Sequence, residues 1–238
     1  MLHFRRGFAL KRKPMSSQLS QEIEDLHNLA VSKGQSTHCP YGHFNVKSEN
    51  RCTKLPDKAV LLKATNPIPG TVGPSRVLFW SGGKDSFLAL QALERENAQV
   101  TLLTSFEPNA GVVPEQDIPM SVIFDQAKHL QRDLIAVPNT GEYVASLLKG
   151  LALLGGEDKP TLVFGDLHLK EVRAWREHAF AEYGYLCHFP LFNVPYPELE
   201  ERLFTTIATR PMTVKFSAIK SISPLAGKFT AGDEITRE

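Results

Sequence analysis

The run Ser-Gly-Gly-Lys-Asp-Ser at residues 81–86 is the part of this sequence best suited to chemistry. It follows the apolar residues 77–80 and precedes a helical stretch that starts at Phe87. Two glycines permit a sharp turn with close backbone approach. The N-terminus of the following helix offers unpaired N–H groups and the positive end of a dipole. A strand–turn–helix unit of this composition predicts an anion site suited to phosphate.

The side chains of this run match the chemistry of phosphate release. Lys84 would neutralise phosphate charge and stabilise a pyrophosphate leaving group. Asp85 would help to hold Mg²⁺ on phosphate oxygens, since that ion prefers one or two carboxylates together with phosphates. Ser81 and Ser86 would add hydroxyl and backbone donors. Such a site needs no covalent nucleophile, because positioning and charge stabilisation carry the reaction.

Two familiar phosphate loops do not fit the run. A Walker A loop requires Gly-x-x-x-x-Gly-Lys followed by Ser or Thr, but Leu78 occupies the first glycine position and Asp85 follows the lysine. The dinucleotide fingerprint fails because its third glycine is missing. The run instead resembles the Ser-Gly-Gly-X-Asp-Ser loop of the N-type ATP pyrophosphatases, or PP-loop superfamily, which binds the β- and γ-phosphates that leave together. The alternative is an incidental Gly-Gly turn between a strand and a helix.

A second segment begins with Gly165 and Asp166, directly after the apolar residues 162–164. Glycine lets a ligand or another backbone approach closely. If residues 162–164 pair with the strand at 77–80, both segments face one crevice outside the carboxyl ends of the strands. Helix capping is the alternative role for Asp166. We expect Trp175 to anchor the core and His168 to be a solvated loop residue.

Together with Gln126-Ala127 and residues 134–138 and 189–192, these two segments resemble the diphthine–ammonia ligase family. The resemblance extends roughly over residues 76–204. It implies an enzyme that activates a carboxylate on ATP, releases pyrophosphate and lets ammonia displace AMP to form an amide. The family substrate is diphthine, a modified histidine of translation elongation factor 2. The implied cofactors are ATP and Mg²⁺, and the implied partners are ammonium and elongation factor 2.

The resemblance also assigns roles to individual residues. It makes Lys84, Asp85 and Asp166 catalytic, with Asp85 as the metal ligand. It assigns nucleotide binding to the following residues: Ser81, Gly82, Gly83, Lys84, Asp85, Ser86, Thr104, Ser105 and Gly165.

One family feature is absent from the chain. Residues 232–238 do not contain the Gly-Glu-X-Gly-Glu-Phe-His-Thr segment that family members usually carry. The acceptor half of the site therefore looks truncated, so a nucleotide-binding pseudoenzyme or ATP-sensing module remains an alternative. An enzyme that activates tRNA is a further alternative, disfavoured by the balanced charge and the lack of a basic stripe.

Strand-like and helix-like stretches alternate from residue 76 onward. This alternation predicts an α/β fold, an open parallel sheet with helices on both faces, of the Rossmann-like adenine nucleotide alpha hydrolase type. The expected strands are residues 77–80, 100–105, 134–137, 161–164 and 212–218. The expected helices are residues 87–96, 120–132, 143–154, 170–183 and 197–207.

Residues 1–75 differ in character from residues 76–238, which we expect to form the ligase-like domain. Residues 16–31 have the pattern of an amphipathic helix, and residues 45–76 read as a linker. Parts of residues 26–46 resemble the two ends of a small cysteine-rich eukaryotic domain. Residues 1–75 also contain His38, Cys39, His43 and Cys52, whose side chains could bind zinc as an alternative role.

Composition limits the remaining function classes. The 238 residues carry a net charge of +1, which does not indicate general binding to nucleic acid. Three cysteines make no disulfide framework and suggest a reducing compartment. No apolar run approaches the ~20 residues that span a bilayer. We therefore expect no membrane association and a cytoplasmic protein. The basic, acid-poor first 20 residues leave a mitochondrial presequence as the alternative.

Overall fold

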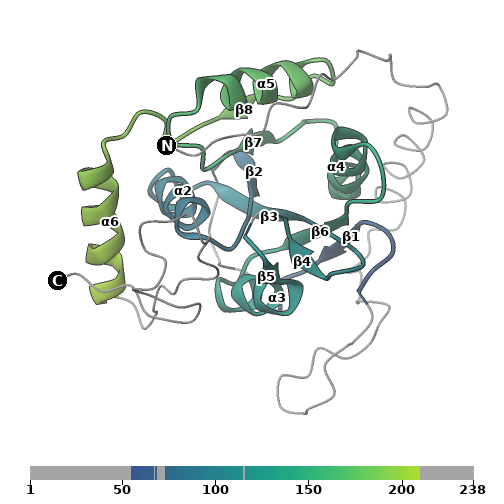
Figure 1. The fold of residues 1–238 in the computed structure, drawn as a ribbon, viewed down its shortest axis with the longest axis horizontal. Coiled ribbons are helices and arrows are strands. Elements are labelled where there is room, and N and C mark those ends of the chain that lie inside the picture. Colours follow the sequence, from purple (N-terminus) through teal and green to yellow (C-terminus); the bar gives the residue numbers. More distant parts are fainter. Residues whose placement is uncertain (1–54, 67, 69–72, 115, 210–238) are drawn as a thin grey trace, which may run out of the picture.

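The computed structural model describes residues 55–66, 68, 73–114 and 116–209. Within these residues strands and helices alternate along the chain (Figure 1). The strands are β1 (Val60–Leu62), β2 (Ser75–Phe79), β3 (Gln99–Phe106), β4 (Val112–Val113), β5 (Ile118–Pro119), β6 (Leu134–Pro138), β7 (Thr161–Val163) and β8 (Cys187–His188). The helices are α2 (Lys84–Arg95), α3 (Met120–His129), α4 (Tyr143–Leu151), the short 3-10 helix η1 (Ala152–Leu154), α5 (Lys170–Ala181) and α6 (Tyr196–Thr209).

A six-stranded sheet forms the centre of the fold, with the strand order β1-β6-β3-β2-β7-β8. The pairs β6–β3, β3–β2, β2–β7 and β7–β8 are parallel. The whole of β6, with the sequence Leu-Ile-Ala-Val-Pro, is buried. Continuous apolar sequence of this kind is typical of a parallel strand covered on both faces. The expected α/β class with a largely parallel sheet is confirmed.

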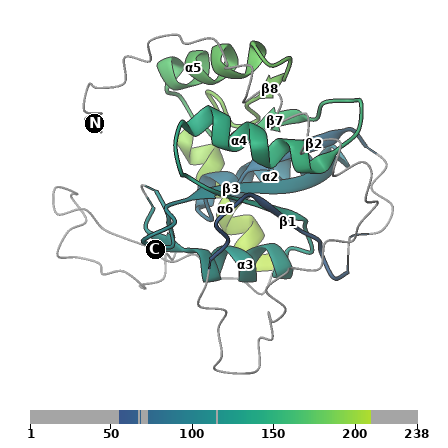
Figure 2. The same cartoon turned by 90° about the vertical axis from the view of Figure 1, so that its right-hand side faces the viewer.

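Helices cover both faces of the sheet, as Figures 1 and 2 show. Side chains alternate along β2, so Leu78 packs in one apolar cluster and Val77 in the other. The Leu78 cluster contains residues of α2, α3 and α6, including Leu90, Ile123 and Leu203. The Val77 cluster contains residues of α4 and α5. This double cover buries the sheet and leaves the ends of its strands as the places where a ligand has access.

The structure corrects the expected linker. Residues 60–62 form β1, which pairs with β6 in an antiparallel register that matches Val60 with Ala136. The linker interpretation of residues 45–76 is therefore wrong at residues 60–62, and also at residues 75 and 76, which begin β2. The antiparallel β1 makes the sheet mixed rather than wholly parallel. The strands β4, β5 and β8 were also not expected. Each contains only two residues, too few to show a period of two.

Several expectations lie outside the described residues. They are the helix at residues 16–31, the His/Cys cluster at residues 38–52 and the strand at residues 212–218. The basic first 20 residues lie outside them as well, so the compartment stays a prediction. The division at residue 76 also stays a prediction. In the part of the chain that the structure describes, no helix has the length and apolar character required to cross a membrane.

Candidate functional site

The strand order reverses between β2 and β7. The chain passes from β2 to β3 and then β6 on one side of the sheet, and later returns to β7 on the other side of β2. Ligands of open α/β sheets bind in the crevice outside the carboxyl ends of the strands at such a point. The turn at residues 80–83 follows β2, and the loop at residues 164–169 follows β7. β2 and β7 pair in parallel, which meets the condition set from the sequence, and both candidate segments lie at the switch point.

The two glycines of the turn differ in what the chain demands of them. Gly82 has a φ of +78°, and a Cβ atom there would lie only 2.7 Å from Ile123 Cδ1 and 2.9 Å from Gln126 Oε1. Its backbone conformation and its packing both require glycine. Gly83 has a φ of −92°, and a Cβ there would meet nothing closer than Ser81 Oγ at 3.5 Å. Neither conformation nor packing within the described chain requires glycine at this second position.

The turn leads directly into the N-terminus of α2, which begins at Lys84. Gly83 is the N-cap residue, and no side chain caps the helix. The first helical hydrogen bond runs from Phe87 N to Gly83 O at 3.1 Å, so the N–H groups of the first turn lack a helical acceptor. Two hydroxyls border this turn: Ser86 Oγ donates to Gly83 O at 2.9 Å and lies 3.4 Å from Ser81 Oγ. Donors and a positive dipole end therefore converge where the sequence predicted a phosphate site.

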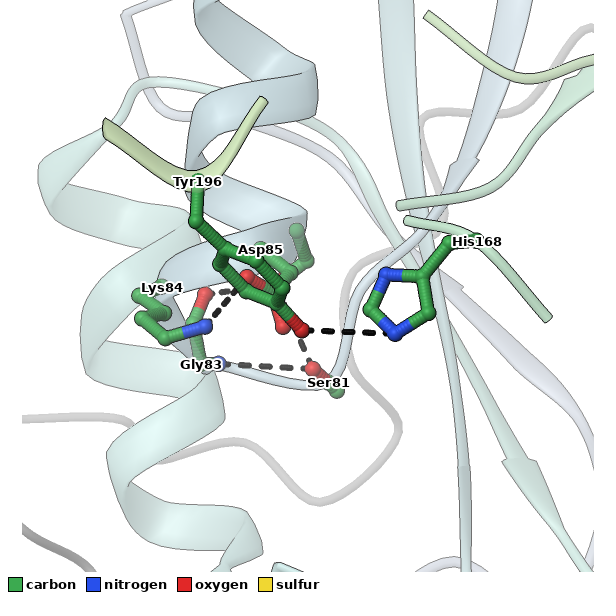
Figure 3. A network of polar contacts seen from close by, with 7 residues as sticks. Ser81, Gly83, Lys84, Asp85, His168 and Tyr196 are labelled. Carbon is green, nitrogen blue, oxygen red and sulfur yellow. Dashed lines mark hydrogen bonds and ion pairs between the residues drawn. The ribbon is translucent and has the colours of Figure 1, made fainter. Parts of the chain in front are cut away.

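The charges of the site are an adjacent lysine and aspartate. Lys84 Nζ lies 2.6 Å from Asp85 Oδ1, and the side chains are 47% and 39% exposed (Figure 3). An exposed ion pair of this kind contributes little to stability. Breaking this ion pair costs little free energy, so Lys84 and Asp85 can each bind a charged ligand instead.

Gly165 brings the second segment against the first. A Cβ on Gly165 would lie 2.9 Å from Asp85 O and 3.1 Å from Ser86 N, which are backbone atoms of the first turn of α2. Glycine is thus required here for a close approach, as expected. The group that approaches it is the backbone of α2 rather than a ligand. The contact joins the loop after β7 to the turn after β2.

Asp166 forms an ion pair across the loop that follows β7. Arg176 Nε lies 2.6 Å from Asp166 Oδ2, and the two side chains are 19% and 18% exposed. The Arg176 guanidinium also lies 4.3 Å from the centroid of the Phe164 ring. The N-cap of α5 is Leu169, and no side chain caps that helix, so the capping alternative for Asp166 is wrong. Its assignment as a catalytic group stays a prediction.

We expect Asp166→Ala to lower the free energy of unfolding by about 1–3 kcal/mol. The substitution leaves the Arg176 guanidinium largely buried without its carboxylate, which is the physical reason for the loss. Urea unfolding followed by circular dichroism measures the effect. The matched control is Glu171→Ala. Glu171 is exposed in the first turn of α5, the helix that contains Arg176, and its replacement should change stability little. Equal stability of Asp166→Ala and the wild type would contradict the structural role of this pair.

His168 and Tyr196 form a second polar contact near the switch point. Tyr196 Oη lies 3.4 Å from His168 Nε2, and the ring centroids are 5.3 Å apart in an edge-to-face arrangement. Both side chains are exposed, and in the view of Figure 3 the Tyr196 ring stands in front of Asp85. His168 is solvated, as expected, but it has an aromatic partner. Tyr196 escaped the sequence reasoning because it lies 28 residues away and belongs to no motif.

Thr104 and Ser105 lie at the carboxyl end of β3, next to β2. Thr104 is 1% exposed, and its hydroxyl donates to Trp80 O at 2.6 Å. This hydroxyl therefore supports the end of β2 directly before the turn. Ser105 is half-buried on the same strand. That these residues lie near an adenosine stays a prediction.

Two further residues lie away from the turn. Trp175 is only partly buried and packs against the Tyr143 ring at 6.2 Å, so it is no deep core anchor. Cys187 is half-buried, and burial followed by the nearby Glu177 raises the pKa of its thiol to about 11. At neutral pH the thiol is therefore protonated, and only the thiolate is a good nucleophile.

Comparison with known proteins adds little to this geometry. No protein-family model matches the chain, and no curated protein matches it either. A predicted subunit of tRNA methyltransferase from Methanocaldococcus jannaschii is similar in structure over 56% of this chain and 75% of its own. The sequence identity is 20% and the TM-score 0.38. Similarity at this level carries no argument about function.

Proposed function

We propose that this protein binds ATP at the turn of residues 81–86 and cleaves it to AMP and pyrophosphate. The observation that carries the proposal is Gly83. It is a glycine that the chain itself does not require, placed at the N-cap of α2 at the switch point of the sheet. A missing side chain at such a place leaves room for a ligand to approach the backbone.

The described residues have distinct tasks in this reaction. The N–H groups of the first turn of α2 and the hydroxyls of Ser81 and Ser86 would bind the β- and γ-phosphates. Lys84 would neutralise the charge that develops on the departing pyrophosphate. Gly165 would hold the loop after β7 against the first turn, so that both segments keep one geometry.

Mg²⁺ fits the donor set of the turn. Among the described residues, no three His, Cys, Asp or Glu side chains gather into a metal cluster. A single partly exposed carboxylate, that of Asp85, stands beside the hydroxyl-lined turn. This suits an ion held mostly by phosphate oxygens and water, with one carboxylate from the protein. Bound there, it would offset phosphate charge.

The finer proposal is amide formation on a protein carboxylate, following the resemblance to diphthine–ammonia ligases. A carboxylate oxygen of diphthine on elongation factor 2 attacks the α-phosphorus of ATP, and the bond to the bridging oxygen breaks to release pyrophosphate. Ammonia then attacks the acyl carbon, loses a proton and displaces AMP. His168, in the loop after β7, and Tyr196, the first residue of α6, contact each other and would meet this acceptor. A nucleotide-binding module would bind ATP without either step.

The test compares pyrophosphate release and ATP binding in the wild type and in Gly83→Ala. The added methyl group meets only Ser81 Oγ, so the melting temperature should fall by no more than the few degrees that a weaker N-cap costs. Affinity for Mg-ATP, measured by calorimetry, should fall at least tenfold, or about 1.4 kcal/mol, because the methyl group occupies the phosphate position. Unchanged affinity would overturn the proposal.

The same assay separates the enzyme from the alternative. Pyrophosphate release that requires ammonium and elongation factor 2 carrying diphthine supports the ligase. Tight ATP binding with no turnover under any of these conditions supports the sensing module. No binding of Mg-ATP by the wild type excludes both.

A further inference from the structure

Gln126 of α3 links the strand before the turn to the turn itself. Trp80 Nε1 donates to Gln126 Oε1 at 2.9 Å, and Gln126 Nε2 donates to Gly82 O at 3.1 Å. Both ends of the side-chain amide are thus used, each in the role its chemistry allows. Trp80 is 3% exposed, so its indole N–H requires a partner within the protein. The amide therefore stands between a buried donor and the carbonyl of the turn.

The packing around Gly82 holds this amide in place. The Cα of Gly82 lies so close to α3 and β5 that a Cβ would be 2.7 Å from Ile123 Cδ1 of α3 and 3.2 Å from Ile118 Cδ1 of β5. On the other side of the turn, Thr104 Oγ1 donates to Trp80 O at 2.6 Å. Thr104 of β3 thus fixes the start of the turn at Trp80, and Gln126 of α3 fixes its middle at Gly82. Two independent supports of this kind restrict the orientation of the peptide units between them.

The bond to Gly82 O has a consequence for the next amide. Gly82 C=O and Gly83 N–H belong to one peptide unit, and in a planar trans unit they point in opposite directions. With its carbonyl directed toward Gln126, this peptide unit turns Gly83 N–H away from α3. Gly83 N–H donates to Ser81 Oγ, with the nitrogen 3.4 Å from the oxygen, so it points to the hydroxyl-lined side of the turn, where a phosphate oxygen would replace this long hydrogen bond.

We infer that Gln126 is a positioning residue of the phosphate site, which acts by orienting the Gly82–Gly83 peptide so that its N–H faces the ligand. This inference rests on the proposed function, because it names the device that prepares the turn for pyrophosphate. Gln126 does not touch the ligand. Without its amide the peptide unit can rotate, and the N–H is no longer directed at the phosphate before binding.

The experiment uses inorganic pyrophosphate as the probe and Gln126→Met as the variant, because methionine has nearly the volume of glutamine and neither donor nor carbonyl. Gln91→Met is the matched control. Gln91 is a buried glutamine whose Nε2 donates to Thr206 Oγ1 at 2.6 Å, so it joins α2 to α6 without touching the turn. Gln126→Met loses two hydrogen bonds between elements and Gln91→Met loses one, so a thermal melt of each variant is recorded to show how much stability each has lost.

Calorimetry should show pyrophosphate affinity at least tenfold weaker in Gln126→Met and within twofold of the wild type in Gln91→Met. A second readout is the amide resonance of Gly83, identified by its disappearance in Gly83→Ala. Its hydrogen exchange should be faster in Gln126→Met than in Gln91→Met.

Three results would overturn the inference. The first is wild-type affinity in Gln126→Met while the wild type binds pyrophosphate, which would leave the proposed function intact. The second is an equal loss of affinity in Gln91→Met, which would show that stability alone explains the effect. The third is no pyrophosphate binding by the wild type, which would remove the proposed function as well.

Discussion

Lys84→Ala is expected to lower ATP-dependent pyrophosphate release by roughly 10²–10³-fold, the usual cost of removing one preorganised charge at a developing anion. The melting temperature should change little. The lysine side chain is 47% exposed, and its ion-pair partner Asp85 is 39% exposed. A partner of this kind contributes at most about 1 kcal/mol. The measurement is a coupled assay for pyrophosphate together with a thermal melt of each variant.

Lys128→Ala is the control for this prediction. Lys128 is an exposed lysine in the last turn of α3. The chain runs from the C-terminus of α3 into the start of β6, so Lys128 lies near the amino ends of the parallel strands. The candidate site lies at their carboxyl ends. Activity of this variant should equal that of the wild type. Loss of cooperative melting in Lys84→Ala, or full activity in it, would show that the turn has a structural role and that the assignment of Lys84 is wrong.

Gly165→Ala is expected to damage both the site and the fold. The added Cβ would lie 2.9 Å from Asp85 O and 3.0 Å from Asp85 C, and backbone atoms cannot move aside as a flexible side chain does. The loop after β7 and the first turn of α2 must therefore separate. Overpacking of this kind costs about 1–3 kcal/mol. Because the displaced atoms belong to the turn that we propose to bind phosphate, Mg-ATP affinity should fall at least tenfold.

Gly141→Ala is the matched control for Gly165→Ala. Gly141 is exposed, has no atom within 4 Å of an added Cβ and does not require a positive φ. Replacement there should leave affinity unchanged and stability equal or slightly higher, because alanine restricts the unfolded chain. Chemical denaturation and calorimetry give the two quantities. Wild-type affinity in Gly165→Ala would mean that the second segment does not support the turn.

Most of the sheet could be predicted from short-range pattern. The strand at residues 134–137 was expected because its run is apolar throughout, and β6 is buried at every residue. The helix after the turn was expected to begin at Phe87, but α2 begins at Lys84. The glycine at the N-cap and the polar residues of the first turn carry little apolar periodicity, so the hydrophobic pattern starts one turn late. β1 was missed because three residues inside a Pro- and Lys-rich stretch show no alternation.

Part of the candidate site could be predicted from the sequence, and part could not. The turn at residues 81–86 could be located because its residues are consecutive and its conformation depends on local preferences of glycine and of a helix N-terminus. The ion pair of Asp166 with Arg176 and the contact of His168 with Tyr196 could not. Each of them depends on where a later helix packs, and no short window of sequence contains that information.

By itself, the sequence determined the alternation of strands and helices, the place of the phosphate-type turn and the absence of a large net charge. Tertiary structure alone decided that β7 pairs with the side of β2 opposite β3, that Gly165 meets the backbone of Asp85, and that Gln126 Nε2 donates to Gly82 O. The physical reason is one of range. Local conformation follows from neighbours along the chain, whereas these contacts join residues tens of positions apart and form only when the sheet and its helices pack together.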